Sequence, residues 1–207
     1  MIEVLISNKS NYLLFLICYF IGSIPFGYIF YKIIKKDDIR NHGSGNIGAT
    51  NVNRLIGKKF GILTLTLDFL KTLCPCLVVH NYFGTEVGVI SGFLTIIGHI
   101  FPIWLKFKGG KGVASYMGFM LATSWPLFII CTTSWMIVIK IIKYSSIAAI
   151  LSILITLIAF KIILFIQFKY NVFLWIKGDP IEFQFTVLVS FIILLKHYSN
   201  IIKIFKK

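Results

Sequence analysis

A glycine-rich polar segment near residue 45 carries side chains suited to holding an anion. Residues 43–51 read Gly-Ser-Gly-Asn-Ile-Gly-Ala-Thr-Asn, and Arg54 follows. Glycines let backbone N–H groups converge on an anion, and hydroxyl and amide side chains add donors. We therefore expect phosphate binding through Gly43, Ser44, Gly45, Asn46, Gly48, Thr50 and Asn51. Arg54 lies three residues after Asn51, so the two share a face if a helix has begun there.

This segment has two other interpretations. Gly43, Gly45 and Gly48 match a G-x-G-x-x-G dinucleotide fingerprint, but that motif functions only between a strand and a helix of a soluble sheet. The plain alternative is a surface loop whose Ser, Thr and Asn cap the following helix. Anion binding remains the preferred interpretation of the segment.

A second glycine-rich segment reads Lys106-Phe-Lys-Gly-Gly-Lys-Gly112. It fails as a Walker motif, because Leu105 stands where the first glycine belongs and Gly112 replaces Ser or Thr. A lysine among glycines at a helix start can still hold phosphate by charge, dipole and backbone donors. The candidates are Lys108, Gly109, Gly110, Lys111 and Gly112. The alternative is a basic loop lying on lipid headgroups.

Three further sets of polar residues lie in otherwise apolar sequence. His197 and Asn200 are three apart near the C-terminus, with Lys203 one turn further, so they share a helix face. Asp68 and Lys71 are also three apart, and either form a structural pair or line a polar substrate cavity. His99 is expected to be a packed, hydrogen-bonded histidine.

The elements that must position these residues are membrane helices. Fifty-seven per cent of the residues are hydrophobic and only 14% are charged, against about a quarter charged in soluble domains. The net charge of +14 would suggest nucleic acid in a soluble protein, but here the lipid bilayer is the partner and no nucleic acid is expected. The four cysteines, Cys18, Cys74, Cys76 and Cys131, lie in apolar runs and predict no metal site.

Apolar runs predict an all-α integral membrane protein, a seven-span helical bundle within a single domain, 1–207. A span needs about 20 apolar residues. The long run 112–139 is interrupted at Pro126, which favours two helices there. The expected spans are 12–31, 55–79, 86–105, 112–122, 125–140, 146–168 and 182–196.

Basic residues predict the orientation of this bundle. With the N-terminus outside, segments on the inner side hold sixteen of the 21 Lys and Arg residues, and segments on the outer side hold three. Cytoplasmic loops carry such an excess. The C-terminus and the active-site loops are therefore expected to be cytoplasmic, where all three motif segments meet phosphate-bearing substrates.

The motifs resemble those of a known family. Gly22-Ser-Ile-Pro-Phe-Gly27, residues 38–54, Leu67-Asp-Phe-Leu-Lys71, Gly98-His-Ile-Phe-Pro102 and residues 106–113 resemble the bacterial acyl-phosphate:glycerol-3-phosphate acyltransferases, the PlsY family. The resemblance implies a multi-pass enzyme of the bacterial inner membrane. Such an enzyme transfers an acyl group from acyl phosphate to the hydroxyl at position 1 of glycerol 3-phosphate, giving lysophosphatidic acid and inorganic phosphate.

The resemblance also implies roles for particular residues. Ser44 and Arg54 match the essential residues of the family's first motif, and Lys111 matches the lysine of the second. Ser146, in Tyr144-Ser-Ser-Ile, matches a phosphate ligand, and His197 and Asn200 match a His-x-x-Asn motif. The tail departs from the family, since no acidic residue follows Asn200. The catalytic residues expected are Ser44, Arg54, Lys111, His197 and Asn200.

Acyl phosphate is a mixed anhydride and is already activated, so no cofactor and no metal are expected. The protein would align the alcohol with the acyl carbonyl and stabilise the developing oxyanion. Two other classes remain as alternatives: an organophosphate transporter, which would favour mid-membrane polar residues and repeated halves, and a non-catalytic lipid-binding scaffold. No obligate protein partner is expected.

Overall fold

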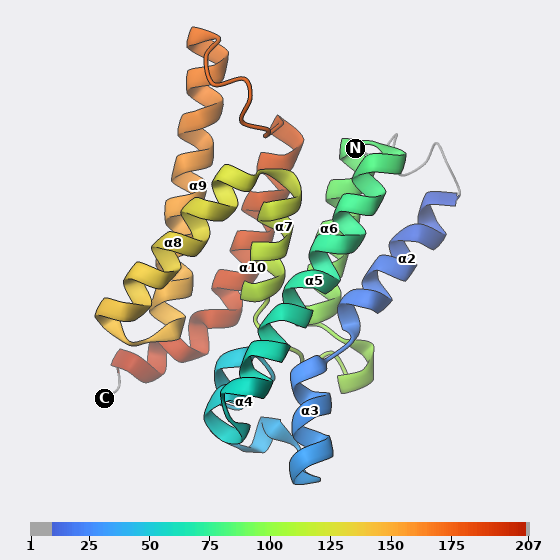
Figure 1. Ribbon diagram of the computed structural model, residues 1–207, viewed down its shortest axis with the longest axis vertical. Coiled ribbons are helices and arrows are strands. Elements are labelled where there is room, and N and C mark those ends of the chain that lie inside the picture. Colours follow the sequence, from blue (N-terminus) through green and yellow to red (C-terminus); the bar gives the residue numbers. More distant parts are fainter. Residues whose placement is uncertain (1–9, 206–207) are drawn as a thin grey trace. The chain divides into compact units, whose positions relative to one another are not determined.

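Helices form the secondary structure of residues 10–205, the part of the 207-residue chain that this computed structural model describes, and no strand occurs among them (Figure 1). The expectations for the N-terminus, and for Lys206 and Lys207, lie outside these residues. The chain divides into two compact units, residues 1–118 and 119–207, called here the first and second units.

Six segments of the described chain are long and apolar enough to cross a membrane. They are Asn11–Lys35, Lys58–Phe83, Thr85–Leu105, Trp125–Ile142, Ser145–Tyr170 and Pro180–Tyr198. Helix α7, Val113–Thr123, is apolar but has only 11 residues. The prediction of an all-helical, multi-pass membrane protein is thus confirmed in its coarse form.

The first span of the first unit is broken in the middle. It consists of α2, Ser10–Ser23, and α3, Phe26–Lys35, with Pro25 between them (Figure 1). Proline has no N–H and disfavours helical geometry in the residue before it. The carbonyl of Ile24 at this break accepts a hydrogen bond of 2.8 Å from the Lys71 ammonium, so the break leaves this carbonyl satisfied.

Single glycines separate the next three helices of the first unit. These are α4, Ala49–Ile56; α5, Lys58–Phe83; and α6, Thr85–Ile100. Gly57 and Gly84 take φ values of +92° and +88° between them, a conformation that glycine adopts without a steric penalty. The span expected from residue 55 therefore begins at Lys58, because Gly57 ends a separate short helix that the hydropathy pattern did not separate.

Helices α2 and α6 approach each other closely at two glycines. A Cβ atom on Gly22 would overlap the backbone carbonyl of Thr95, and one on Gly98 would overlap that of Tyr19. Small residues let membrane helices bring their backbones together in this way. This packing fixes the end of α6 that carries His99.

A small apolar core holds the two loops of the first unit that carry the motifs. The 3₁₀ turns η1, Ile39–Asn41, and η2, Ile103–Leu105, each contribute one buried residue, Ile39 and Leu105. They pack with Tyr31 of α3, with Ile47 and with Val52 of α4. Burial of these side chains ties both loops to the ends of α3 and α4.

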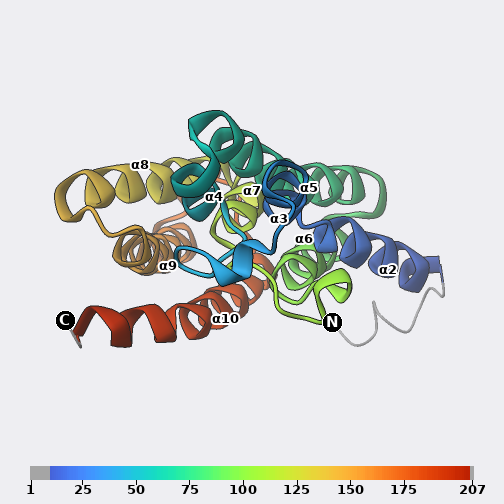
Figure 2. The same cartoon turned by 90° about the horizontal axis from the view of Figure 1, so that it is seen from below.

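The second unit consists of the end of α7 and three longer helices. These are α8, Trp125–Ile142; α9, Ser145–Tyr170; and α10, Pro180–Phe205. Helix α9 packs between α8 and α10 (Figure 2). The predicted break near Pro126 is confirmed, since α7 ends at Thr123 and α8 begins at Trp125.

The exposed surface of α9 is apolar over much of its length. Its exposed side chains include Leu151, Leu154, Ile155, Ile158, Ile162 and Phe165. A helix that is hydrophobic on all sides is stable only where its surroundings are apolar. The hydrocarbon of a lipid bilayer provides such apolar surroundings.

Candidate functional site

The first glycine-rich loop is shaped from within by Asn51. This side chain is 1% exposed. Its amide donates hydrogen bonds to the carbonyls of His42 (3.1 Å) and Asn46 (2.9 Å), and its Oδ1 accepts one from the Ser44 N–H (3.0 Å). Both amide hydrogens are therefore committed to the loop. Asn51 acts here as a brace, which differs from the anion contact expected of it.

The loop turns on two glycines in the left-handed region. Gly43 and Gly45 have φ values of +60° and +74°, and a Cβ atom on Gly43 would overlap the Asn51 Oδ1 atom. The turn closes with a 3.0 Å hydrogen bond from the Gly45 N–H to the His42 carbonyl. Ser44, between the glycines, is exposed. The loop thus presents the Ser44 hydroxyl at its tip.

Helix α4 follows this loop and carries Arg54 in its last turn. Gly48 caps its start, and its carbonyl accepts hydrogen bonds from the N–H groups of Asn51 and Val52. Thr50 and Arg54 are exposed, while Asn51 and Val52 are buried. A helix does begin where expected, but Arg54 shares its exposed face with Thr50, four residues earlier. The partial positive charge of the helix start lies beside the loop.

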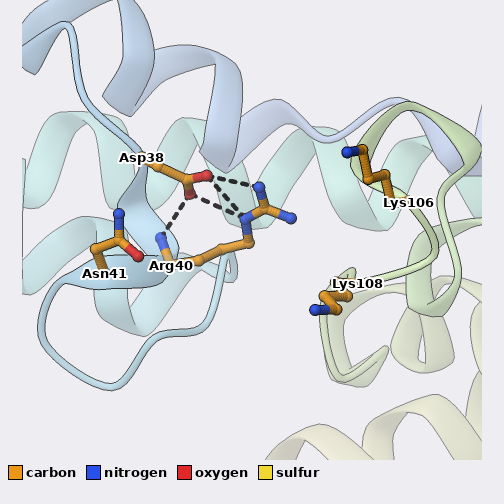
Figure 3. A pocket seen from close by; sticks show the side chains of 5 residues that line it. All are labelled: Asp38, Arg40, Asn41, Lys106 and Lys108. Carbon is orange, nitrogen blue, oxygen red and sulfur yellow. Dashed lines mark hydrogen bonds and ion pairs between the residues drawn. The ribbon is translucent and has the colours of Figure 1, made fainter.

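Asp38 and Arg40 form an ion pair that the site prediction did not include. The Arg40 Nη2 atom lies 2.6 Å from Asp38 Oδ2, and Nε donates to both carboxylate oxygens (Figure 3). Arg40 Nη1 donates to the carbonyl of Leu105 at 3.2 Å, which links the first loop to the second. Opposite charges two residues apart, within a segment that resembles a family motif, were a sequence signal for the ion pair but not for the link to Leu105.

Both acidic residues of this loop stay ionised at neutral pH. The hydrogen bonds from Arg40 hold the pKa of Asp38 below its ordinary value, and the His42 ring, 2.7 Å from Asp37, does the same for the pKa of Asp37. Hydrogen bonds to a carboxylate stabilise its charged form. These two carboxylates therefore stay negatively charged across the physiological range.

The second glycine-rich loop folds back onto His99. The Gly109 N–H donates to the carbonyl of Ile100 (3.2 Å), and the Gly110 N–H donates to that of His99 (3.0 Å). A Cβ atom on Gly110 would overlap the His99 ring. Glycine is therefore required here by close contact. Lys111 is partly buried and lies just before α7, which begins at Val113.

Beneath this loop lies a buried charged cluster of the first unit. Lys71 Nζ lies 2.8 Å from Asp68 Oδ1, and the same oxygen lies 3.5 Å from His99 Nδ1. All three side chains are almost fully buried. Lys71 also caps the α2–α3 break, and Ser115 Oγ donates to the Asp68 carbonyl at 3.0 Å. The cluster therefore ties α5 to the broken span and to the residues on either side of the second loop.

In the second unit, the end of α10 meets the start of α9. Asn200 Nδ2 donates a 2.8 Å hydrogen bond to Ser146 Oγ. His197, one turn earlier on α10, is 2% exposed and its Nδ1 lies 2.8 Å from the carbonyl of Ile193. A carbonyl only accepts, so Nδ1 carries the proton and Nε2 is the basic atom of the neutral ring. His197 and Asn200 lie three residues apart on one helix, as predicted, while the Lys203 side chain lies outside the described part.

The predicted site residues fall into two groups. The first unit brings Ser44, Thr50 and Arg54 to the surface around one loop and helix, and holds Lys108 to Gly112 in the next loop. The second unit brings together Ser146, His197 and Asn200. Asp68 and Lys71, which were expected either to pair or to face substrate, form a buried pair.

Comparisons with known proteins identify the family of the chain. The profile of a family described as glycerol-3-phosphate acyltransferase matches residues 12–207. A glycerol-3-phosphate acyltransferase of Bartonella henselae is 41% identical over 202 residues, covering 93% of this chain and 87% of its own. One from Agrobacterium fabrum is 40% identical over 186 residues, covering 90% and 84%.

Two crystal structures are also similar. One is PlsY (YgiH), an integral membrane glycerol 3-phosphate acyltransferase, in its glycerol 3-phosphate form; it matches with a TM-score of 0.82 at 32% identity, over 96% of this chain and 93% of that chain. The lysophosphatidic acid form of the same protein has a TM-score of 0.78 at 31% identity, with the same coverage.

Proposed function

Because the chain belongs to the glycerol-3-phosphate acyltransferase family, we propose that it transfers an acyl group from acyl phosphate to the hydroxyl at position 1 of glycerol 3-phosphate. The hydroxyl oxygen attacks the acyl carbonyl carbon, and the bond between that carbon and the phosphate oxygen breaks. The hydroxyl proton leaves with a phosphate oxygen or through His197. The products are lysophosphatidic acid and inorganic phosphate.

One observation carries this proposal. A chain that is 32% identical and has nearly the same fold is described in a glycerol 3-phosphate form and in a lysophosphatidic acid form. These two compounds are the acceptor and the product of the proposed reaction. The glycine-rich segments carry Ser44, Lys108 and Lys111, and Arg54 follows the first of them, so their side chains are donors of the kind that such phosphates need.

We assign the phosphate of glycerol 3-phosphate to Arg54, Lys111 and Ser146. Arg54 is exposed on α4, and a guanidinium can hold two phosphate oxygens at once. Ser44, at the exposed tip of the first loop, would hold the acyl phosphate or the oxyanion that forms on its carbonyl. The remaining residues of the two loops, including Gly112 and Lys108, would support phosphate binding.

His197 and Asn200 are assigned to the acceptor. Asn200 already donates to Ser146, so the two form one polar unit at the ends of α9 and α10. The basic Nε2 atom of His197 suits a hydrogen bond from the acceptor hydroxyl. We favour orientation of the acceptor as the role of His197, with a substrate phosphate oxygen as the base.

The membrane arrangement is also part of the proposal. We propose seven crossings in the bacterial inner membrane, with the N-terminus outside and the motif loops and C-terminus in the cytoplasm. The excess of basic residues in alternate segments supports this orientation. In this arrangement both phosphate substrates reach the site from the cytoplasm, while the acyl chain lies among the spans.

The test is to incubate the purified protein with palmitoyl phosphate and radiolabelled glycerol 3-phosphate. We expect labelled lysophosphatidic acid and a stoichiometric release of phosphate. Arg54→Gln should lose about 10–100-fold in kcat/KM, since a hydrogen bond to a charged group contributes roughly 1.5–3 kcal/mol. Lys59→Gln removes a nearby exposed charge and serves as the matched control.

The alternatives give different results in the same preparation. Uptake of label into sealed vesicles without product would support a transporter. Binding of both substrates without turnover by the wild-type protein would support a lipid-binding scaffold. A reaction of equal rate with palmitoyl-CoA would contradict the assigned donor.

A further inference from the structure

A pocket in the first unit lies where two membrane spans end. It is a cavity of about 310 Å³ lined by Asp38, Arg40, Asn41, Lys106 and Lys108 (Figure 3). The segment Asn11–Lys35 ends three residues before the first of these, and the segment Thr85–Leu105 ends one residue before Lys106. The pocket therefore lies at the level where the chain leaves the hydrocarbon, which is the depth of lipid headgroups.

The charge of the pocket suits an anion. Three basic side chains and one acidic side chain line it, a formal excess of two positive charges. Asp38 directs both of its carboxylate oxygens to Arg40, so it fixes the guanidinium and offers little repulsion to a ligand. Arg40 is held in addition by the Leu105 carbonyl at 3.2 Å and by the Tyr28 ring at 5.6 Å. The guanidinium is thus in place before any ligand arrives.

The two lysines complete the opposite side of the pocket. Figure 3 shows the ammonium ends of Lys106 and Lys108 directed toward the side on which Arg40 stands. Lys106 and Phe107 take left-handed φ values of +54° and +61°, an uncommon backbone for residues other than glycine. This turn lies in the loop that carries both lysines and begins where the span Thr85–Leu105 ends.

Apolar side chains beside the lysines point to a membrane-bound ligand. Ile103, Trp104 and Phe107 are 44%, 61% and 56% exposed. Tryptophan is enriched at membrane interfaces, where its ring lies among the headgroups. Exposed apolar side chains alternating with lysines in one loop match a surface that inserts its apolar part and leaves its charges beside lipid phosphates.

We propose that this pocket, the interfacial basic pocket, binds a phosphate group at the membrane surface. The group belongs either to the headgroup of an anionic lipid or to a soluble phosphate ester. The site goes beyond the proposed reaction, in which Lys108 supports phosphate binding but neither Arg40 nor Lys106 has a role. An anion bound between Arg40 and the two lysines would hold the first and second glycine-rich loops together.

The test measures binding directly and does not depend on turnover. The purified protein in detergent is titrated with phosphatidylglycerol or with phosphatidylcholine, and bound lipid is counted by native mass spectrometry. The informative variant is the pair Lys106→Gln and Lys108→Gln, since Arg40 is bonded to Asp38 and to the Leu105 carbonyl and its loss would disturb the loop itself. The matched control is Lys140→Gln with Lys143→Gln, two exposed lysines of the second unit.

We expect the wild type and the control pair to prefer phosphatidylglycerol. The Lys106/Lys108 pair should bind it roughly tenfold more weakly, since each basic residue near an anionic surface contributes a several-fold factor. An unchanged thermal midpoint would show that the pocket variant is folded. The proposal would be overturned if both double variants lost affinity for phosphatidylglycerol equally, or if the Lys106/Lys108 variant lost none.

A competition with inorganic phosphate identifies the source of the ligand. If phosphatidylglycerol stays bound in millimolar phosphate, the site takes lipid headgroups. If phosphate displaces the lipid from the wild type, the site also accepts soluble phosphates. Failure of the wild type to bind either probe would contradict the site altogether.

Discussion

His197 has one ring nitrogen committed to its own helix. Nδ1 donates to the carbonyl of Ile193 at 2.8 Å, so the chemistry of this residue depends on Nε2. Glutamine places a polar group near the position of Nε2, and asparagine places one near that of Nδ1. If His197 orients the acceptor, His197→Gln should raise KM for glycerol 3-phosphate modestly, and His197→Asn should raise it more. Steady-state kinetics on both variants measure this difference.

A general base would behave differently. Its removal typically costs about 10²–10⁴-fold in rate, and the wild-type rate would fall at acid pH, because a protonated imidazole cannot accept the hydroxyl proton. We expect a weak acid limb in the wild type. A steep limb that disappears in His197→Gln, with the glycerol 3-phosphate constant unmoved, would assign the base role to His197.

Asn51 gives a second prediction at the scale of a residue. Asn51→Asp keeps the shape of the side chain but removes both donors, which leaves the carbonyls of His42 and Asn46 without this partner. We expect a loss of about 1–3 kcal/mol in stability and a loss of activity. Asn53→Asp, on an exposed position of the same helix, is the matched control. Thermal unfolding in detergent would contradict the brace role if the two variants had equal midpoints.

At this scale the sequence identified residue types better than their tasks. It predicted that the segment around Ser44 binds an anion and that Asn51 contributes to this binding, and both stay predictions; it predicted neither the hydrogen bonds of the Asn51 amide to the carbonyls of His42 and Asn46 nor the contact of Arg40 with Leu105. A motif shows which donors are present, whereas the direction of each side chain depends on contacts made after folding. The bond from Arg40 to Leu105 joins residues 65 positions apart, and no local pattern contains it.

The second loop acts as an element that is seated on His99. Gly110→Ala places a methyl group against the imidazole ring, so the loop that carries Lys111 must move. Displacements of about 1 Å at a site can cost roughly 100-fold, and we expect a raised KM for glycerol 3-phosphate at similar expression. Gly84→Ala, which strains a turn with φ +88° but has open space around it, should lower stability without changing KM. An unchanged KM in Gly110→Ala would return the loop to a purely connecting role.

Gly45→Ala tests the first glycine-rich loop, where the substitution acts mainly through backbone conformation rather than through a steric clash. Gly45 has φ +74°, and a Cβ atom there would lie 3.1 Å from the Arg40 carbonyl. The loss of stability therefore comes mainly from backbone strain and amounts to about 1 kcal/mol. Relief of this strain would also shift Ser44. We expect a smaller rise in KM for glycerol 3-phosphate than Gly110→Ala produces. A larger rise in this KM for Gly45→Ala than for Gly110→Ala would contradict the prediction.

The Asp68–Lys71–His99 cluster supports both the broken first span and the second loop. Asp68→Asn leaves the Lys71 charge buried without its carboxylate, and breaking a buried ion pair costs about 3–5 kcal/mol. Asp68→Asn combined with Lys71→Met removes both charges and should recover part of this loss. Thermal midpoints of the three proteins give the comparison. Equal midpoints for the wild type and Asp68→Asn would contradict the structural role of the pair.

The helices themselves were mostly predictable, because long apolar runs have few alternatives in a membrane. The break at Pro126 followed from the chemistry of proline. The separate helix α4 did not, since it depends on Gly57 adopting φ +92° rather than continuing the helix. A glycine permits such a turn without requiring it, so the packing of the neighbouring helices determines whether the helix ends at Gly57.

For the whole molecule, the chain distributes its chemistry over two compact units. The glycine-rich loops belong to the first unit, and Ser146, His197 and Asn200 belong to the second. The sequence could group these residues only by their expected side of the membrane. That grouping depends on the number of crossings, and so on whether α7 crosses.

The topology therefore gives the last prediction. Helix α7 has 11 residues, which span about 16 Å at 1.5 Å per residue, roughly half of the hydrocarbon thickness. If α7 nevertheless completes a crossing, Lys111 and Lys143 both face the cytoplasm and Lys177 faces outward. If it does not, Lys143 faces outward and Lys177 inward. The basic excess on the inner side favours the first arrangement.

Single cysteines at positions 42, 111, 143 and 177, in a variant lacking the four native cysteines, should be labelled by an impermeant maleimide in sealed cells only at 177. Labelling at 143 with protection at 177 would establish six crossings, and labelling at 111 would place the second loop outside, away from cytoplasmic phosphate esters.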